Sequence, residues 1–166
     1  MGKIIIGVMG PGEGATSLDT QLAYELGQLI AQTGWVLLTG GRNVGVMDAA
    51  CRGARDAGGL TVGILPTDRP IAVSTAVDIP IYTDLGNGRN NLNVLSSQVV
   101  IACGMGTGTV SEVALALKNQ KPVILLNWSE EGQRFFQSLS PDEIWVADRP
   151  ETAIQLTHTL LSAPAT

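Results

Sequence analysis

The chain has 166 residues, of which 45% are hydrophobic and 15% charged, and its formal net charge is −5 at pH 7. This length suits a single domain, residues 1–166, that buries about two thirds of its unfolded surface. The 10 Lys and Arg residues are scattered along the chain, so the basic patch of a nucleic-acid-binding protein is missing. The apolar runs are too short to cross a membrane. We therefore expect a protein that binds neither nucleic acid nor membranes.

The two cysteines, Cys51 and Cys103, lie in apolar segments and lack the spacing of a disulfide framework or a metal site. Such cysteines are typical of reduced thiols inside a protein core. The sequence therefore predicts a cytoplasmic protein without a metal site of its own, and a core role for Cys103.

Apolar segments of strand length alternate with segments of helix length. The predicted strands are residues 3–9, 35–39, 60–65, 98–103, 122–126 and 144–146, and the predicted helices are residues 18–33, 45–57, 109–119 and 150–161. The strands are continuously hydrophobic, which is typical of a parallel sheet covered on both faces. The sequence therefore predicts an α/β protein with a Rossmann-like open parallel sheet flanked by helices.

Residues 66–90 interrupt this pattern with three prolines and the turn sequence Asn87-Gly88. We interpret this segment as a long loop, and long loops in compact domains are usually functional. At the last predicted helix, Asp148 is the expected N-cap and Pro150 is expected in the first turn.

One face of the predicted helix at residues 45–57 carries small apolar side chains. Its members are Val46, Ala49, Ala50, Gly53, Ala54 and Ala57. Such a face packs closely against another helix, either in a second copy of the chain or on its own sheet. We expect a homo-oligomer, either a dimer or a tetramer built from dimers.

Residues 104–112, Gly-Met-Gly-Thr-Gly-Thr-Val-Ser-Glu, join a predicted strand to a predicted helix. Glycines leave the backbone N–H groups unshielded, and the start of a helix adds free donors and the positive end of its dipole. The spacing matches neither a P-loop nor a strict dinucleotide-binding fingerprint. We therefore expect a phosphate at Gly106, Thr107, Gly108 and Thr109, with helix capping as the other possible role of Thr109.

Three further glycine-rich turns are expected at the carboxyl ends of strands or next to them. They supply Gly10, Gly12 and Gly14; Gly40, Gly41, Arg42, Asn43 and Gly45; and Arg89 with Asn90. In an open parallel sheet the loops that follow strands meet at one edge, where ligands bind. The sequence therefore predicts one cleft shared by all four turns.

The charged residues near these turns each have two interpretations. Arg89 has a planar cationic group suited to phosphate or molybdate oxygens, but a surface position or a salt bridge to Glu112 would also explain it. Glu112 could orient a ribose hydroxyl or cap the backbone N–H groups of the helix start. Arg42 could face the cleft or be an exposed charge.

These motifs together resemble the LOG-like proteins, which include phosphoribohydrolases that split a nucleoside 5′-monophosphate into base and ribose 5-phosphate. The family's Pro-Gly-Gly-x-Gly-Thr-x-x-Glu motif falls on Gly104 to Glu112, and its catalytic Arg-Lys falls on Arg89-Asn90. Here the lysine is replaced by Asn90, and the first glutamate of the enzymes' Glu-Glu pair is replaced by Ser111.

The chain is more similar to a shorter branch of this superfamily, the molybdenum cofactor carrier proteins. The shared features are the chain length, the Arg89-Asn90 pair and the Thr-Gly-Thr-x-Ser-Glu loop. This resemblance implies that the chain binds, carries and protects a phosphorylated pterin, the molybdenum cofactor, as cargo and without catalytic residues. It also implies molybdenum enzymes or their insertion machinery as partners.

Two alternatives stay open. One is a nucleoside 5′-monophosphate phosphoribohydrolase with Arg89 and Glu112 as its catalytic pair. The other is a nucleotide-sensing protein that binds its ligand without turnover.

Overall fold

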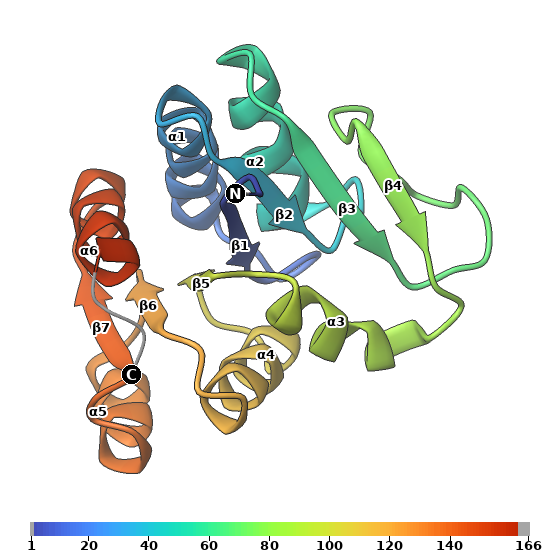
Figure 1. Cartoon of the computed structure of the whole chain (residues 1–166). Helices are drawn as coiled ribbons and strands as arrows, with labels where there is room; N and C mark the ends of the chain where they lie inside the picture. Colours follow the sequence, from blue (N-terminus) through green and yellow to red (C-terminus); the bar gives the residue numbers. More distant parts are fainter. Residues whose placement is uncertain (1, 163–166) are drawn as a thin grey trace.

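Seven short apolar segments pair into one parallel sheet, which crosses the whole molecule (Figure 1). Its strands are β1 (Ile5–Met9), β2 (Val36–Thr39), β3 (Thr61–Leu65), β4 (Ile79–Tyr82), β5 (Val99–Cys103), β6 (Val123–Leu126) and β7 (Ile144–Ala147). The strand order is β4-β3-β2-β1-β5-β6-β7, and every neighbouring pair is parallel. This computed structural model describes residues 2–162. The predicted α/β Rossmann-like sheet is confirmed.

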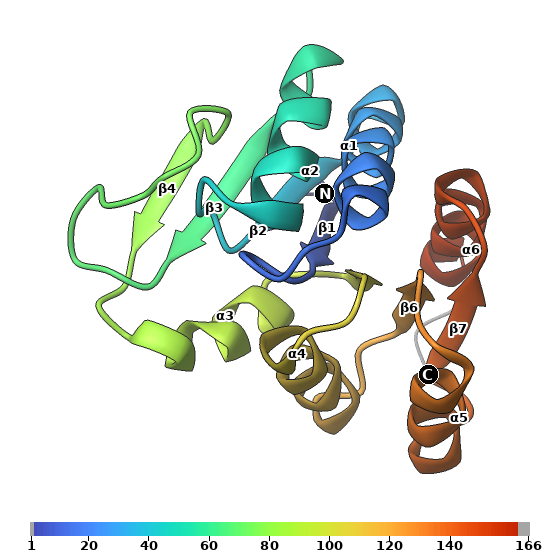
Figure 2. The same cartoon turned by 180° about the vertical axis from the view of Figure 1, so that it is seen from behind.

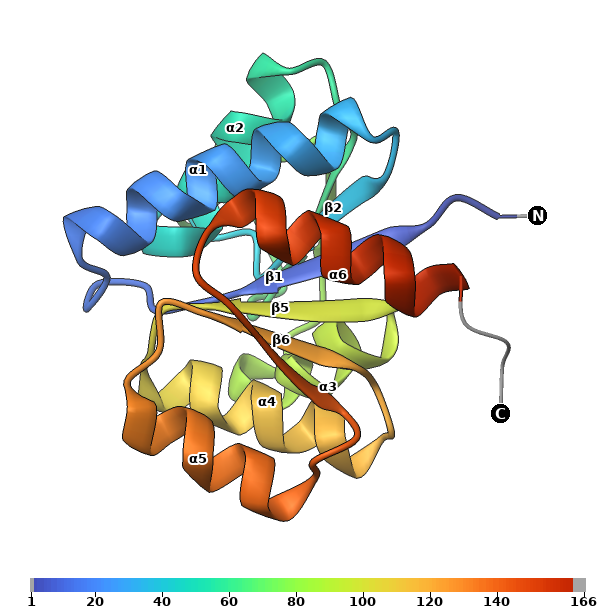
Figure 3. The same ribbon diagram turned by 90° about the vertical axis from the view of Figure 1, so that its left-hand side faces the viewer.

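Helices cover both faces of the sheet, as Figure 3 shows from the side. They are α1 (Ser17–Gln32), α2 (Gly45–Asp56), α3 (Arg89–Leu95), α4 (Thr107–Lys118), α5 (Glu130–Leu139) and α6 (Pro150–Ser162), with a short 3₁₀ helix, η1 (Gly86–Gly88), before α3. α1, α2 and α6 contribute to the hydrophobic core on one face, and α3, α4 and α5 contribute to the core on the other. Because both faces are covered, β2, β5 and β6 are buried along their whole length, and β1 is buried beyond its first residue.

The sheet has its switch point at β1, which pairs with β2 on one side and with β5 on the other. The chain runs outward from β1 to the edge strand β4, then returns to β5 and runs to the opposite edge at β7 (Figure 2). The loops that follow β1 and β5 therefore diverge to opposite faces of the sheet. Such divergence opens a crevice at the carboxyl ends of the strands.

The interpretation of residues 66–90 as one long loop is wrong in part. This segment contains the edge strand β4 and the 3₁₀ helix η1, and α3 begins at Arg89. Pro80 lies in the centre of β4, opposite Gly63 of β3. Proline cannot donate a ladder hydrogen bond, but an edge strand tolerates it because its outer side has no partner strand.

Two expectations for the last third of the chain need correction. The sequence analysis did not predict helix α5, and Asp148 is not the N-cap of α6. Residues 130–139 have only three large apolar side chains, and of these only Phe136 is buried, whereas Phe135 and Leu139 are exposed. Helix α6 starts at Pro150 as expected, but Asp148 lies one residue before the cap position. Its carboxylate accepts a hydrogen bond from the Thr152 hydroxyl (2.8 Å).

The small apolar face of α2 packs within the chain. Its side chains are buried against α1 and the sheet. A Cβ on Gly27 of α1 would collide with the carbonyl oxygen of Ala50, and one on Gly53 of α2 would collide with that of Tyr24. The backbones of the two helices are thus nearly in contact, and this face offers no surface to a second copy.

Candidate functional site

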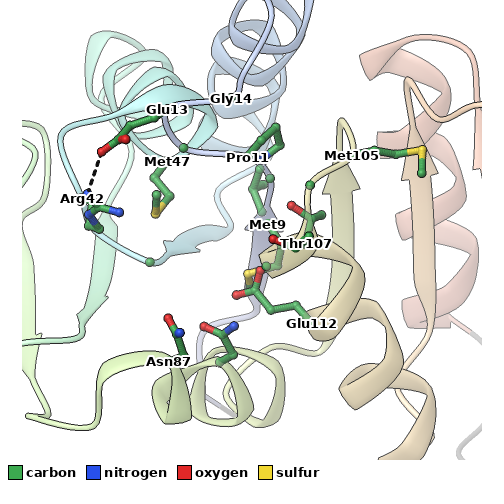
Figure 4. A pocket seen from close by; sticks show the side chains of 18 of the residues that line it. Met9, Pro11, Glu13, Gly14, Arg42, Met47, Asn87, Met105, Thr107 and Glu112 are labelled. Atoms are coloured by element: carbon green, nitrogen blue, oxygen red, sulfur yellow. Dashed lines mark ion pairs between the residues drawn. The ribbon is translucent and has the colours of Figure 1, made fainter.

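A cleft of about 500 Å³ opens at the carboxyl ends of the strands, beside the switch point (Figure 4). The four glycine-rich turns meet here, as the sequence predicted. The expected residues that line the cleft are Gly10, Gly12, Gly14, Gly40, Arg42, Arg89, Asn90, Gly106, Thr107, Gly108, Thr109 and Glu112.

Three expected residues, Gly41, Asn43 and Gly45, do not line the cleft. The Asn43 backbone N–H donates to the carbonyl oxygen of Ala72 (2.8 Å). Gly41 and Gly45 have positive φ angles of 73° and 56°. A Cβ would meet the Gly63 backbone at Gly41, and the carbonyl oxygens of the loop after β1 at Gly45. The absence of a side chain at these two glycines lets neighbouring loops approach closely, and this close approach shapes the cleft wall.

The start of α4 presents its backbone donors to the cleft. Its N-cap is Gly106, in an extended conformation and with no side chain to bond the first N–H groups. Thr107 and Gly108 are exposed, and no atom lies within 4 Å of the position of a Cβ on Gly108. Thr109 does not cap the helix, because its side chain is buried and its hydroxyl is unpaired. The first N–H groups of α4 thus have no side-chain cap, and uncapped helix starts of this kind favour anions.

Arg89 is a buried residue of the cleft and not a surface arginine. It is 8% exposed, and its Nη1 donates to the carbonyl oxygens of Gly40 and Ile64. Burial lowers the pKa of the guanidinium, and the nearby Glu112 partly offsets this effect. The two side chains form no salt bridge among the described residues. Both alternative interpretations of Arg89 are therefore wrong in this structure.

Glu112 lies in the second turn of α4, too far along the helix to cap its first N–H groups. It is 8% exposed, and its Oε1 accepts a hydrogen bond from Nδ2 of Asn93 on α3 (3.0 Å). Burial raises the pKa of the carboxyl to about 7, although the Asn93 hydrogen bond and the Arg89 charge act in the opposite direction. Glu112 can therefore exchange a proton near neutral pH.

Asn90 and Ser111, the two departures from the enzymes' motifs, contact each other. Nδ2 of Asn90 donates to the Ser111 hydroxyl (3.2 Å), which donates to the carbonyl oxygen of Gly108 (2.6 Å). A neutral hydrogen-bonded pair thus stands where the enzyme motifs have a lysine and a glutamate. One cation and one carboxylate are lost together, beside the first turn of α4.

At the mouth of the cleft, Arg42 and Glu13 extend from the loops after β2 and β1. Their side chains approach to 3.6 Å, as the dashed line in Figure 4 marks. Glu13 is largely exposed and Arg42 about one third exposed, so this ion pair contributes little to stability. Arg42 therefore faces the cleft, with Glu13 as its exposed ion-pair partner. The flexible apolar side chains of Met47 and Met105 form part of the wall.

Asp19 connects three of the loops around the cleft, and the sequence analysis did not identify it. Its carboxylate accepts hydrogen bonds from the backbone N–H of Thr16 (2.9 Å) and from Nδ2 of Asn127 (2.7 Å). It also packs against Gly104, where a Cβ would collide with it. Asp19 thus ties together the loops after β1, β5 and β6. Cys103 is fully buried next to Asp19 and does not line the cleft, and burial raises its thiol pKa to about 12.

Other residues that were not predicted also line the cleft. They are Val8, Met9, Pro11, Glu13 and Asn87. Pro11 and Glu13 stand between predicted glycines, so the glycine turn itself was the available signal. Val8 and Met9 are apolar strand residues that carry no such signal.

The described part of the chain holds no cluster of three or more His, Cys, Asp or Glu residues that could bind a metal ion. Between residues 2 and 162, no helix has the length and hydrophobicity needed to cross a membrane.

A parallel sheet with a glycine-lined cleft at its switch point defines a Rossmann-like ligand-binding protein. The model of the SLOG cluster4 family matches residues 3–154, and the chain belongs to this family.

Solved structures similar to this chain include molybdenum cofactor proteins. The molybdenum cofactor binding protein of Rippkaea orientalis is 63% identical, with a TM-score of 0.96, over 98% of this chain and 99% of that one. The molybdenum cofactor carrier protein of Chlamydomonas reinhardtii is 50% identical, with a TM-score of 0.93, over 98% and 100% of the two chains. A cytokinin riboside 5′-monophosphate phosphoribohydrolase of Mycobacterium tuberculosis is 33% identical over 64% of this chain and 62% of that protein.

Proposed function

We propose that this chain is a molybdenum cofactor carrier that binds the cofactor as cargo and protects it from oxidation. The observation that carries this proposal is the cleft itself, where an open helix start adjoins the neutral Asn90–Ser111 pair. Backbone donors suit the phosphate of a pterin, and binding alone needs no nucleophile. The high identity to the molybdenum cofactor proteins of Rippkaea orientalis and Chlamydomonas reinhardtii supports the same function.

We place the phosphate end of the cargo at Gly106, Thr107, Gly108 and Thr109, where α4 begins. Arg42 lies across the cleft from this turn (Figure 4), whereas Pro11 of the Gly10–Gly14 loop lies next to Gly106. Arg42 is held by one exposed carboxylate, so an anionic ligand can displace Glu13 at small cost. The cargo would then contact donors on both sides of the cleft.

A phosphoribohydrolase is the second candidate, because Arg89 and Glu112 both line the cleft and a phosphoribohydrolase is among the relatives. In this structure Arg89 already donates to two backbone carbonyl groups, and Glu112 is held by Asn93. The enzymes' lysine position is occupied by Asn90. These contacts favour binding over turnover.

We also infer a homo-oligomer, with molybdenum enzymes or their insertion machinery as recipients of the cargo. β4 is an edge strand whose residues are all exposed, including Ile79 and Ile81. An apolar edge strand favours contact with a second copy. Two buried free thiols, Cys51 and Cys103, support a reducing compartment such as the cytoplasm.

Retention of the cargo tests this proposal. The freshly purified protein is incubated with molybdenum cofactor under anaerobic conditions, separated from unbound cofactor and then exposed to air. We expect saturable binding and slower loss of the cofactor than in buffer alone. Equal rates of cofactor loss with and without the protein would contradict the proposal.

A further inference from the structure

Three side-chain polar atoms in residues 2–162 are buried without a hydrogen-bond partner, and all three belong to α3 and α4. They are Nε of Arg89, Oδ1 of Asn93 and Oγ1 of Thr109. Native proteins pair nearly all such atoms, because a buried unpaired polar group costs about 1–3 kcal/mol. Their gathering on two helices therefore points to one ligand-binding feature.

The two helices place these residues on facing surfaces. Asn93 follows Arg89 by one turn of α3, and Glu112 follows Thr109 by one turn of α4. The hydrogen bond between Asn93 and Glu112 joins the two helices at this level. We call these four residues, Arg89, Asn93, Thr109 and Glu112, the polar floor. Each is more than nine-tenths buried, and all except Asn93 line the cleft.

The polar floor offers a defined set of hydrogen-bonding groups. Among the members that line the cleft, Arg89 Nε–H is a donor, the two oxygens of the Glu112 carboxylate are acceptors, and the Thr109 hydroxyl is either. A ligand that pairs with all of these groups has a flat ring edge with two adjacent N–H donors beside a carbonyl oxygen. The 2-amino-4-oxo-pyrimidine ring of a pterin has this edge, and guanine has the same one.

We propose that the polar floor binds the 2-amino-4-oxo edge of the ligand's ring, with its two N–H groups donating to the Glu112 carboxylate and its carbonyl oxygen accepting from Arg89. Asn93 does not line the cleft, and its part is to hold Glu112 in position. This assignment rests on the proposed function, since it takes the phosphorylated pterin as the ligand. It names the residues that select the ring, whereas the start of α4 selects only the phosphate.

The dimensions of α4 agree with this arrangement. Glu112 follows Thr107 by five residues, which corresponds to about 7.5 Å along the helix axis. A ligand that contacts both the first turn and the polar floor must therefore have a ring edge several ångströms away from its phosphate. Adenine lacks the carbonyl oxygen for Arg89 and has a ring acceptor beside its amino group. The polar floor should therefore discriminate against AMP.

Calorimetry with four probes at pH 8 tests the assignment. The probes are inorganic phosphate, a metal-free phosphorylated pterin, GMP and AMP. For the wild-type protein we expect the phosphorylated pterin to bind at least 10-fold more tightly than AMP. We expect Glu112→Gln and Asn93→Leu to weaken pterin binding at least 10-fold while phosphate affinity stays within twofold. Glu151→Gln, in the exposed first turn of α6, is the matched control and should change neither.

The outcomes separate the two proposals. Equal affinity for the pterin and AMP in the wild-type protein would overturn the role of the polar floor, and this comparison needs no variant. A loss of phosphate affinity equal to the loss of pterin affinity in Glu112→Gln would also overturn it. Tight binding of GMP without binding of the pterin would support the polar floor but contradict the molybdenum cofactor as cargo. Circular dichroism establishes that both variants are folded.

Discussion

The burial of Glu112 makes the stability of the fold depend on pH. Its carboxyl has a pKa of about 7 in the folded protein, above the ordinary value of 4.5. The folded state therefore holds a proton that the unfolded state releases between these two values. The stabilisation from the protonated carboxyl is complete below about pH 4.5 and is lost as the pH rises to about 7. The shift corresponds to about 3 kcal/mol.

We predict that Glu112→Gln is more stable than the wild-type protein at pH 8, by about 1–3 kcal/mol, and close to it at pH 4.5. Glutamine keeps the shape and the contact with Asn93 but never carries a buried charge. Urea unfolding of both proteins at the two pH values measures the difference, and Glu151→Gln serves as the exposed control. If the unfolding free energies of the two proteins differ by the same amount at both pH values, Glu112 does not titrate near pH 7.

A second residue-scale prediction concerns the anion site. Gly108→Val adds a branched side chain where the structure has open space, so the fold has room for it, but a phosphate no longer reaches the backbone. We expect molybdenum cofactor affinity to fall at least ~10-fold, about 1.4 kcal/mol. Gln155→Val, at an exposed position of α6, should leave the affinity for the cofactor unchanged. Near-normal binding of Gly108→Val in calorimetry would place the phosphate elsewhere.

At the scale of elements, the α1–α2 contact depends on glycines that let the helices touch. Gly53→Ala places a methyl group against the carbonyl oxygen of Tyr24, and such overpacking typically costs about 1–3 kcal/mol. We expect this destabilisation even though alanine is the better helix former. Gly108→Ala, in open space on α4, is the matched control. Chemical denaturation that finds Gly53→Ala as stable as the wild-type protein would contradict the contact.

The order of most elements could be predicted because buried parallel strands have continuous apolar runs. The helix predicted at residues 18–33, for example, is Ser17–Gln32. β4 escaped prediction because Pro80 argues against a strand unless its edge position is known. α5 escaped prediction because only one of its three large apolar side chains, that of Phe136, is buried, whereas Phe135 and Leu139 are exposed. Both failures concern elements whose environment, and not their local pattern, makes them stable.

The candidate site could likewise be predicted only in part. Glycine turns could be predicted from the sequence because their backbone requirement is local. The partners of Glu112 and Arg89 could not, since Asn93 and the Gly40 carbonyl group reach them only through tertiary packing. Ser111 and Asn90 were noted as separate departures from a motif, and only the structure joins them as one pair.

At the scale of the whole molecule, we predict association through the β4 edge. Light scattering should give at least twice the chain mass of 17.3 kDa, because exposed apolar residues such as Ile81 lie on an edge strand. Ile81→Lys should shift the protein toward the monomer. Val146→Lys, on the opposite edge strand β7, is the matched control. A mass of one chain for the wild-type protein across a range of concentrations would contradict this prediction.

The most direct test of the carrier function compares retention with turnover in one preparation. Molybdenum cofactor binding is measured by calorimetry, and release of free base from AMP is measured by chromatography over many equivalents of substrate. We predict saturable cofactor binding that Gly108→Val weakens, with no more than trace release of base. Sustained release of base that Glu112→Gln abolishes, without binding of the cofactor, would contradict it.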